Sequence, residues 1–366
     1  MGNILAIKLK LNKIFYKMKE NWWKIIGIGL MLFALIFGML TPLKPGLPSV
    51  YPFNGKAGNE LTVSIQGYNT HFEEAKNQRV WLKLGDYTLA SSKLEATSSN
   101  LLKATFATPA VLPSKDTVVV FSLITDNEID GASVMPSAIF IKQSVIDSSG
   151  AAQIWPQNAL DNLHQQAAIT FPYRNVLGET IRNLYYHVSL WFAMFIILAV
   201  SVYYSIKYLN KGNMLDDHRA DALVAVGVLF GLLGCATGSI WAKHTWGTWW
   251  TMDVKLNMTA IFMLIYLAYF VLRGSFQDEI KRARLAAVYN IFAFASIIPL
   301  LFVIPRLVDS LHPGNGGNPG FGGEDLDNTM RMAFYPAIIG MTLIELCMAD
   351  LRYRLAVLAD KVLDRM

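Results

Sequence analysis

Six apolar segments, each long enough to cross a lipid bilayer as a helix, limit what this chain can fold into. A helix needs about 17 to 25 apolar residues to span the hydrocarbon layer. Only 16% of the 366 residues are charged, whereas soluble domains average about a quarter. The sequence therefore predicts an all-α polytopic membrane bundle of six transmembrane helices. The predicted spans are 22–41, 186–207, 222–242, 255–273, 286–305 and 332–350.

The first span follows a lysine-rich stretch, as the apolar part of a signal peptide would. However, no small-residue cleavage site follows it, and Thr41 and Pro42 simply end the apolar run. We therefore expect residues 1–21 to be a cytoplasmic N-terminus and residues 22–41 to be an uncleaved anchor.

Basic residues cluster in four of the segments that flank the predicted spans. With six spans, all four clusters fall on one side of the membrane, which the positive-inside rule assigns to the cytoplasm. We expect both termini there, including the tail 351–366, so that segments 42–185, 243–254 and 306–331 face outward. The clusters are Lys8, Lys10, Lys13, Lys17 and Lys19; Lys207, Lys211 and Arg219; Arg273, Lys281, Arg282 and Arg284; and Arg352, Arg354, Lys361 and Arg365.

The long segment between the first and second spans has the alternating pattern of β-strands over residues 58–146. Leu61 to Ile65 is one such run, and turn sequences such as Asp130-Gly131 separate the runs. Several short strands in about 100 residues favour a small immunoglobulin-like sandwich. We predict an inserted extracytoplasmic β-sandwich-like domain over 42–150, with a docking or shielding role, and a linker over 151–185 that returns to the bundle.

Four of the nine tryptophans lie within residues 241–250, namely Trp241, Trp246, Trp249 and Trp250. Tryptophan favours the membrane–water interface, so an aromatic belt is one interpretation. A belt distributes aromatic residues over several helix ends, whereas these share one short segment, where Gly247 allows close backbone approach. Gathered indole faces form a platform for a large planar apolar ligand. The residues alone support belt and platform about equally.

The run Trp246-Gly247-Thr248-Trp249-Trp250, followed by Asp253, resembles the tryptophan-rich WWD signature of haem-handling proteins of cytochrome c assembly. The preceding Gly238-Ser239-Ile240-Trp241 is similar to the CcmC branch of that family, haem exporter protein C. Met252 stands where the family usually has a third closely spaced tryptophan, so one face of the platform differs. The resemblance covers about residues 20–41 and 175–350, and the β-rich segment departs from the compact family pattern.

The resemblance implies haem as the ligand and two histidines in outer loops as its axial ligands. His187 at the start of the second span and His312 after the fifth match this pattern, because both lie at outer ends of spans. Neutral imidazole is a good axial donor to haem iron. Arg306 and Arg331 flank the His312 loop and are candidates for pairing with haem propionates, with snorkelling at the interface as an equal alternative. Asp253 is expected to orient the tryptophan motif.

Other motifs carry less weight. His244 is a second candidate ligand within the tryptophan motif, while His218 falls on the cytoplasmic side. The glycine-rich stretch 313–323 lacks the Lys-Ser/Thr of a phosphate-binding loop, and its composition suits a mobile flap. Cys235 and Cys347 lie in apolar runs without Cys-x-x-Cys spacing, and we interpret them as small hydrophobic residues.

Together these features predict a non-hydrolytic membrane protein that binds haem at its outer face, with Trp241, Trp246, Gly247, Trp249, Trp250 and Asp253 at the site. The resemblance implies presentation of haem to a periplasmic chaperone of the CcmE type. It also implies an ABC transporter and a small helper subunit as partners, and the bacterial inner membrane as location. The net charge of +5 gives no reason to expect nucleic acid.

Two alternatives remain open from the sequence. The first is the membrane subunit of a haem lyase that attaches haem to apocytochrome, although such proteins usually have further histidines and spans. The second is a membrane-anchored binding or structural protein that acts through its β-rich domain and carries no pigment.

Overall fold

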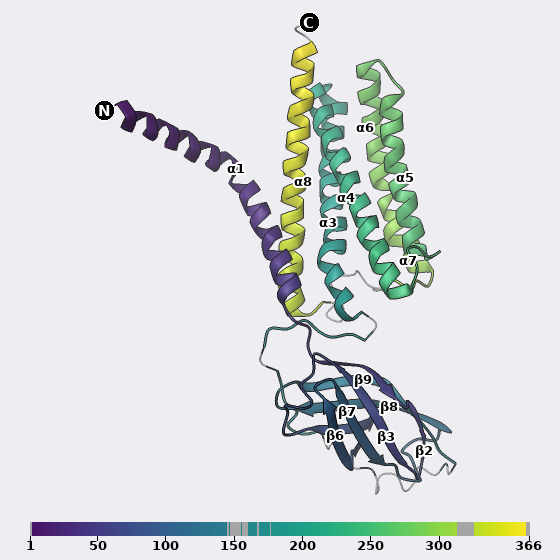
Figure 1. The fold of residues 1–366 in the computed structure, drawn as a ribbon. Helices are drawn as coiled ribbons and strands as arrows, with labels where there is room; N and C mark the ends of the chain where they lie inside the picture. Colours follow the sequence, from purple (N-terminus) through teal and green to yellow (C-terminus); the bar gives the residue numbers. More distant parts are fainter. Residues whose placement is uncertain are drawn as a thin grey trace. The chain divides into compact units, whose positions relative to one another are not determined.

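The computed structural model describes residues 2–144, 146, 155, 160–166, 168–175, 177–312 and 326–363, with the backbone alone for residues 2–20. The chain divides into two compact units, one formed by Met1–Leu40 with Thr180–Met366 and the other by Thr41–Glu179. The first unit is helical and the second is built of strands (Figure 1). The glycine-rich stretch predicted as a flap and much of the predicted linker lie outside the described residues.

The described part of the helical unit contains six helical segments long and apolar enough to cross a membrane, as the sequence predicts. They are Asn21–Leu40, Gly178–Lys211, Met214–Trp246, Val254–Gly274, Glu279–Leu307 and Asn328–Leu363. The elements that compose them are α1 (Gly2–Leu40), η2 (Gly178–Arg182), η3 (Leu184–Val188), α3 (Ser189–Lys211), α4 (Met214–Trp246), α5 (Val254–Gly274), α6 (Glu279–Ala295), η4 (Ile298–Val303), α7 (Ile304–Leu307) and α8 (Asn328–Leu363).

Helix α4 extends beyond its predicted end at residue 242 and stops only at Trp246. Gly247 ends it because its φ of 78° is a left-handed conformation that glycine adopts without a steric penalty. Asp253 then begins α5 by accepting a hydrogen bond from the backbone amide of Lys255. Trp241 and Trp246 therefore lie on a helix, and only Trp249 and Trp250 lie in the connecting loop. The prediction that one short loop carries the whole cluster is corrected accordingly.

Two segments of this unit wind more loosely than an α-helix, as π-helix. They are η3, which contains His187, and η4, which runs from Ile298 to Val303. Pro299 and Pro305 supply no amide hydrogen to the helical ladder, which favours the irregular winding of η4. Such π-helical turns occur frequently at functional sites.

Helices α3, α4 and α8 pack against one another, α1 packs against α8, and α6 joins the α5–α6 pair to α3. Asn290 of α6 donates to the hydroxyls of Ser201 and Ser205 of α3 at 2.9 and 3.0 Å. Arg273 of α5 donates to both carboxylate oxygens of Asp217 of α4 at 2.7 and 2.9 Å. These paired polar groups hold α5 and α6 against α3 and α4, with Arg273 near the end of the bundle away from Trp246 and Asn290 in the middle of its span.

The β-rich unit contains two sheets. Strands β1 (Gly46–Tyr51), β3 (Glu60–Tyr68), β7 (Leu101–Ala107) and β6 (Lys93–Ser98) are neighbours in that order in the first sheet. Strands β2 (Asn54–Lys56), β9 (Gly131–Lys142), β8 (Val118–Asn127), β4 (Arg79–Leu84) and β5 (Tyr87–Ala90) form the second. Pairing is antiparallel except between β2 and β9. Alternate residues of both sheets, such as Val63 and Phe121, enter one buried core that also contains Trp155.

The chain enters and leaves the β-rich unit at adjacent points. Leu43 and Phe171 form a parallel bridge, and the amide of Lys44 donates to the carbonyl of Phe171 at 2.7 Å. The amide of Phe171 in turn donates to the carbonyl of Pro42 at 2.9 Å. The two ends of this segment are therefore fastened to each other.

A buried carboxylate anchors the end of the second sheet. The side chain of Asp126 is 0% exposed and accepts from Arg79 Nε at 2.9 Å and from the backbone amide of His164 at 2.8 Å. Burial alone would raise the pKa of Asp126, but the hydrogen bonds from His164 and Arg79 outweigh it and lower this pKa below its ordinary value. The ionised Asp126 therefore stabilises the folded β-rich unit at pH values above the ordinary pKa of an aspartate. This stabilisation is lost as the pH falls through the lower pKa that Asp126 has in the folded protein.

We expect Asp126→Asn to lower the opening free energy of β8 and β9 by about 2 kcal/mol at neutral pH, since Arg79 loses its buried counter-charge. The difference from wild type should shrink below about pH 4. Amide hydrogen exchange of the detergent-solubilised protein measures both effects. Asp116→Asn is the control because Asp116 is exposed, and equal losses in the two variants would contradict the assignment.

Candidate functional site

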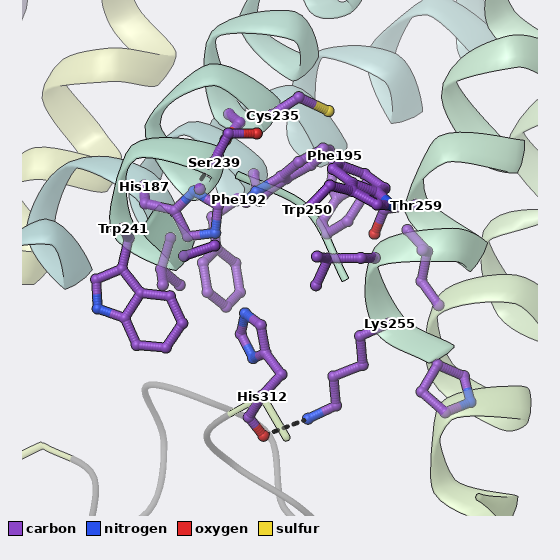
Figure 2. Close-up of a pocket in the computed structure, with 18 of the residues that line it drawn as sticks. His187, Phe192, Phe195, Cys235, Ser239, Trp241, Trp250, Lys255, Thr259 and His312 are labelled. Atoms are coloured by element: carbon purple, nitrogen blue, oxygen red, sulfur yellow. Dashed lines mark hydrogen bonds between the residues drawn. The ribbon is translucent and has the colours of Figure 1, made fainter. Parts of the chain in front are cut away.

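A pocket lies between α3, α4, α5 and η4, at the end of the bundle that carries Trp246 (Figure 2). It holds about 1430 Å³ of empty space, including its open mouth. Of the residues predicted for the site, those that line it are His187, His312, Trp241, Trp246, Trp250 and Arg306. Residues from helices far apart in the sequence therefore converge on one aromatic cavity.

His187 is fixed from one side by α4. Its Nδ1 lies 3.0 Å from the carbonyl oxygen of Gly234 and 3.2 Å from the hydroxyl of Thr237. The Thr237 hydroxyl donates its own hydrogen to backbone carbonyls of α4, so both groups act as acceptors toward His187. Nδ1 therefore carries the proton, and Nε2 keeps its lone pair for a ligand.

Gly238 provides the room for this imidazole. A Cβ atom at position 238 would lie 2.7 Å from Cε1 of His187, closer than side chains tolerate. The Gly238-Ser239-Ile240-Trp241 sequence thus places a glycine against His187 and an indole in the same pocket, one turn further along α4.

His312 approaches the pocket from the segment after α7. Its ring centre lies 6.5 Å from that of His187, and the two ring planes are inclined by 42°. The same ring lies 5.9 Å from Trp241 and 6.4 Å from Trp246. Figure 2 shows the His312 imidazole pointing toward that of His187, with Trp241 beside them. The two histidines predicted from outer loops are thus adjacent in space.

Asp253 holds the segment that carries His312. Its Oδ2 accepts from the hydroxyl of Ser310 and from the amide of Leu311, both at 2.8 Å. Burial alone would raise the pKa of Asp253, but the hydrogen bonds from Ser310, Leu311 and Lys255 outweigh it and lower this pKa. Asp253 is therefore ionised at neutral pH, with both carboxylate oxygens occupied by donors.

The four clustered tryptophans have different environments. Trp241 and Trp246 meet edge to face with ring centres 5.1 Å apart, and Trp250 lines the pocket while donating toward Asn257 at 3.4 Å. Trp249 is 59% exposed and does not line the pocket, and neither does Gly247. Met252 is 89% exposed.

The basic residues that the sequence suggested for the site also differ in whether they line the pocket. Arg306 lines the pocket, donates to the carbonyl of Phe302 and lies over its ring. Arg331 donates to Asn328 at 3.0 Å and does not line the pocket. His244 is exposed and does not line it either.

Sequence reasoning missed Lys255, which lines the pocket and whose Nζ lies 3.5 Å from the carbonyl oxygen of His312. A signal for it exists, because a cation in the first turn of a helix opposes the helix dipole and so suggests another role. It also missed Trp191 and Phe195, which follow His187 at helical spacing and extend the pocket along α3.

These features define an integral membrane protein with a two-histidine aromatic pocket at one end of a six-span helical unit. The chain belongs to the family described as "Heme exporter protein C" (CcmC), whose model matches residues 160–365. That match contains the whole pocket and begins after the strands of the β-rich unit.

Individual relatives agree with this assignment. The chain is 29% identical over 184 residues to Heme exporter protein C of Bradyrhizobium diazoefficiens, covering 50% of this chain and 68% of the relative. It is 23% identical over 180 residues to Heme exporter protein C of Escherichia coli K12, covering 48% and 70% of the two chains. The protein of the same name from Haemophilus influenzae is 28% identical over 144 residues, covering 37% and 55%.

We expect Gly238→Ala to lower the stability of the purified protein by about 1 to 3 kcal/mol, because the added methyl group collides with His187. Thermal unfolding in detergent, followed by tryptophan fluorescence, measures the loss. Gly29→Ala is the matched control in a membrane span, since no heavy atom lies within 4 Å of the corresponding Cβ position. A Gly238→Ala variant as stable as this control would show that the His187 ring is not tightly held.

Proposed function

We propose that this protein handles haem for cytochrome c assembly and binds it in the aromatic pocket, with His187 and His312 as the two axial ligands. Haem is here the cargo. The observation that carries the proposal is the 6.5 Å separation of the two imidazole ring centres within a tryptophan-lined pocket. The membership of the haem exporter protein C family agrees with it.

The spacing of the two histidines fits a metal between them. An imidazole nitrogen lies about 2 Å from a bound metal and about 1 Å from its ring centre, so two axial imidazoles have centres about 6 Å apart. The separation of 6.5 Å is close to this value. The protonated Nδ1 of His187 donates to the Gly234 carbonyl, and metal-binding histidines usually make such a hydrogen bond with the ring nitrogen that does not hold the metal.

The rest of the lining suits a flat apolar molecule with carboxylate groups at one edge. Trp241, Trp246 and Trp250 offer indole rings to a macrocycle. Arg306 and Lys255 are the cations of the lining and are our candidates for pairing with propionates. Trp249, Gly247, Asp253 and Arg331, which the sequence also suggested, do not line the pocket, and we assign them no direct contact.

We further propose that the pocket faces the periplasm, with both termini in the cytoplasm, and that the protein resides in the bacterial inner membrane. The four basic clusters support this orientation. From that side haem would be presented to a periplasmic chaperone of the CcmE type. An ABC transporter and a small helper subunit of the same maturation system would be its partners in the membrane.

The β-rich unit, whose strands β1 to β9 precede the family match, would serve as a docking or shielding module. The strand orders β1-β3-β7-β6 and β2-β9-β8-β4-β5 support the immunoglobulin-like sandwich that the sequence predicts. Fold alone does not identify its ligand.

The first test is the absorption spectrum of detergent-purified protein before and after addition of hemin. We expect a Soret band from six-coordinate haem in the wild type. It should weaken and change to a five-coordinate form in both His187→Ala and His312→Ala, since each variant removes one axial donor. His244→Ala is the control, because this exposed histidine belongs to the same motif but does not line the pocket. If the wild-type protein shows no Soret band from bound haem after hemin is added and the unbound hemin is removed, the proposal is refuted and a membrane-anchored binding protein is favoured.

The second test compares two adjacent tryptophans. We expect Trp250→Ala to weaken hemin binding by about tenfold, or about 1.4 kcal/mol, because it removes an aromatic wall of the pocket. Trp249→Ala should change the affinity by less than about twofold, since its indole is outside the lining. Titration of hemin into both variants measures the difference, and equal losses would indicate that the loop rearranges around the ligand.

A further inference from the structure

The two proposed ligands are held by unequal means. His187 is part of a helical segment, and its ring is fixed by Gly234, Thr237 and the close approach of Gly238. His312 lies outside the helices, on a segment held to the rest of the pocket by Asp253, Ser310 and Lys255. A ligand on such a segment moves more readily than one on a packed helix.

Asp253 is central to this attachment. Oδ1 caps α5 through the amide of Lys255 at 2.9 Å, while Oδ2 receives Ser310 and Leu311. The Ser310 hydroxyl also accepts from the amide of His312 at 3.1 Å. One carboxylate thus connects the start of α5 directly to the two residues before His312, across 57 positions of sequence.

Lys255 adds a second tie from the same turn of α5, through its Nζ and the carbonyl of His312 (Figure 2). Its 3.5 Å distance is long compared with the 2.8 Å bonds of Asp253, so the carboxylate makes the firmer connection.

We propose that Asp253 is the positioning residue for His312, and that His312 is the axial ligand that exchanges when haem is transferred, while His187 stays bound. This inference rests on the proposed function. It assigns the Asp of the tryptophan motif to the placement of a histidine distant in sequence, without contact between Asp253 and haem.

The experiment uses the full-length protein loaded with hemin in detergent. Asp253→Ser keeps a hydroxyl that caps α5 but removes the second oxygen, so the Ser310–Leu311 tie is lost. Asp278→Ser is the matched control, because Asp278 caps α6 through the amide of Lys281 in the same way and does not line the pocket. Ser310→Ala removes one bond of the tie and leaves the α5 cap intact, and Ser310→Thr retains a hydroxyl.

The readouts are the coordination state of the haem and its affinity for added imidazole. We expect Asp253→Ser to resemble His312→Ala: five-coordinate haem that retains His187, binds imidazole at least about tenfold more tightly than wild type, and returns to the six-coordinate spectrum. Ser310→Ala should shift in the same direction by a smaller amount. Asp278→Ser and Ser310→Thr should behave as wild type.

The outcomes separate the two hypotheses. If His312→Ala itself leaves the haem spectrum unchanged, the proposed ligation is wrong. If His312→Ala changes the spectrum while Asp253→Ser and Ser310→Ala remain six-coordinate and bind imidazole as wild type does, the ligation stands and the positioning role of Asp253 is refuted. If His312→Ala loses its haem in excess imidazole while His187→Ala keeps it, then His312 and not His187 retains the haem, and the assignment of the exchanging ligand is refuted.

Discussion

The hydrocarbon layer offers no hydrogen bonds to the backbone, and this constraint determines where the protein can place irregular structure. Within the described residues the spanning segments are helical apart from a turn at Ser296, and they depart from the α-helix only in the 3-10 helix η2 and the π-helical segments η3 and η4. The loops that bring Trp250, Asp253 and His312 together lie at one end of the helices. A site that must combine residues from several spans is therefore built where the helices end and side chains on loops can reach across.

The contacts between the helices differ along the length of the helical unit. Toward the opposite end, Arg273 joins α5 to Asp217 of α4, and in the middle of the helices Asn290 joins α6 to Ser201 and Ser205 of α3. Removing one partner of a buried ion pair leaves an uncompensated charge, so these contacts resist separation. Near Trp246, by contrast, the facing surfaces are largely aromatic rings and other apolar side chains. The helical unit thus has polar pairs in its middle and toward one end, and a largely aromatic pocket at the other end.

Much of this could be predicted from sequence. The spans were predicted correctly because long apolar runs have few alternatives, and the family resemblance identified His187 and His312, which the structure brings side by side. The sequence could not predict that Trp250 lines the pocket while Trp249 does not, because this depends on how the chain turns after Gly247. The contact between Asp253 and Ser310 has no local signature, because it joins residues on either side of two spans. Lys255 carried only the weak signal of a cation at a helix start.

The β-rich unit begins and ends at one point, where Leu43 and Phe171 pair with each other. A domain inserted into another chain in this way has its first and last residues side by side. It can therefore be connected to the rest of the chain at two neighbouring points. In evolutionary terms, the helical part can acquire, exchange or lose such a unit in a single event without altering the pocket. The family match accordingly begins only after the strands of this unit and contains the whole pocket.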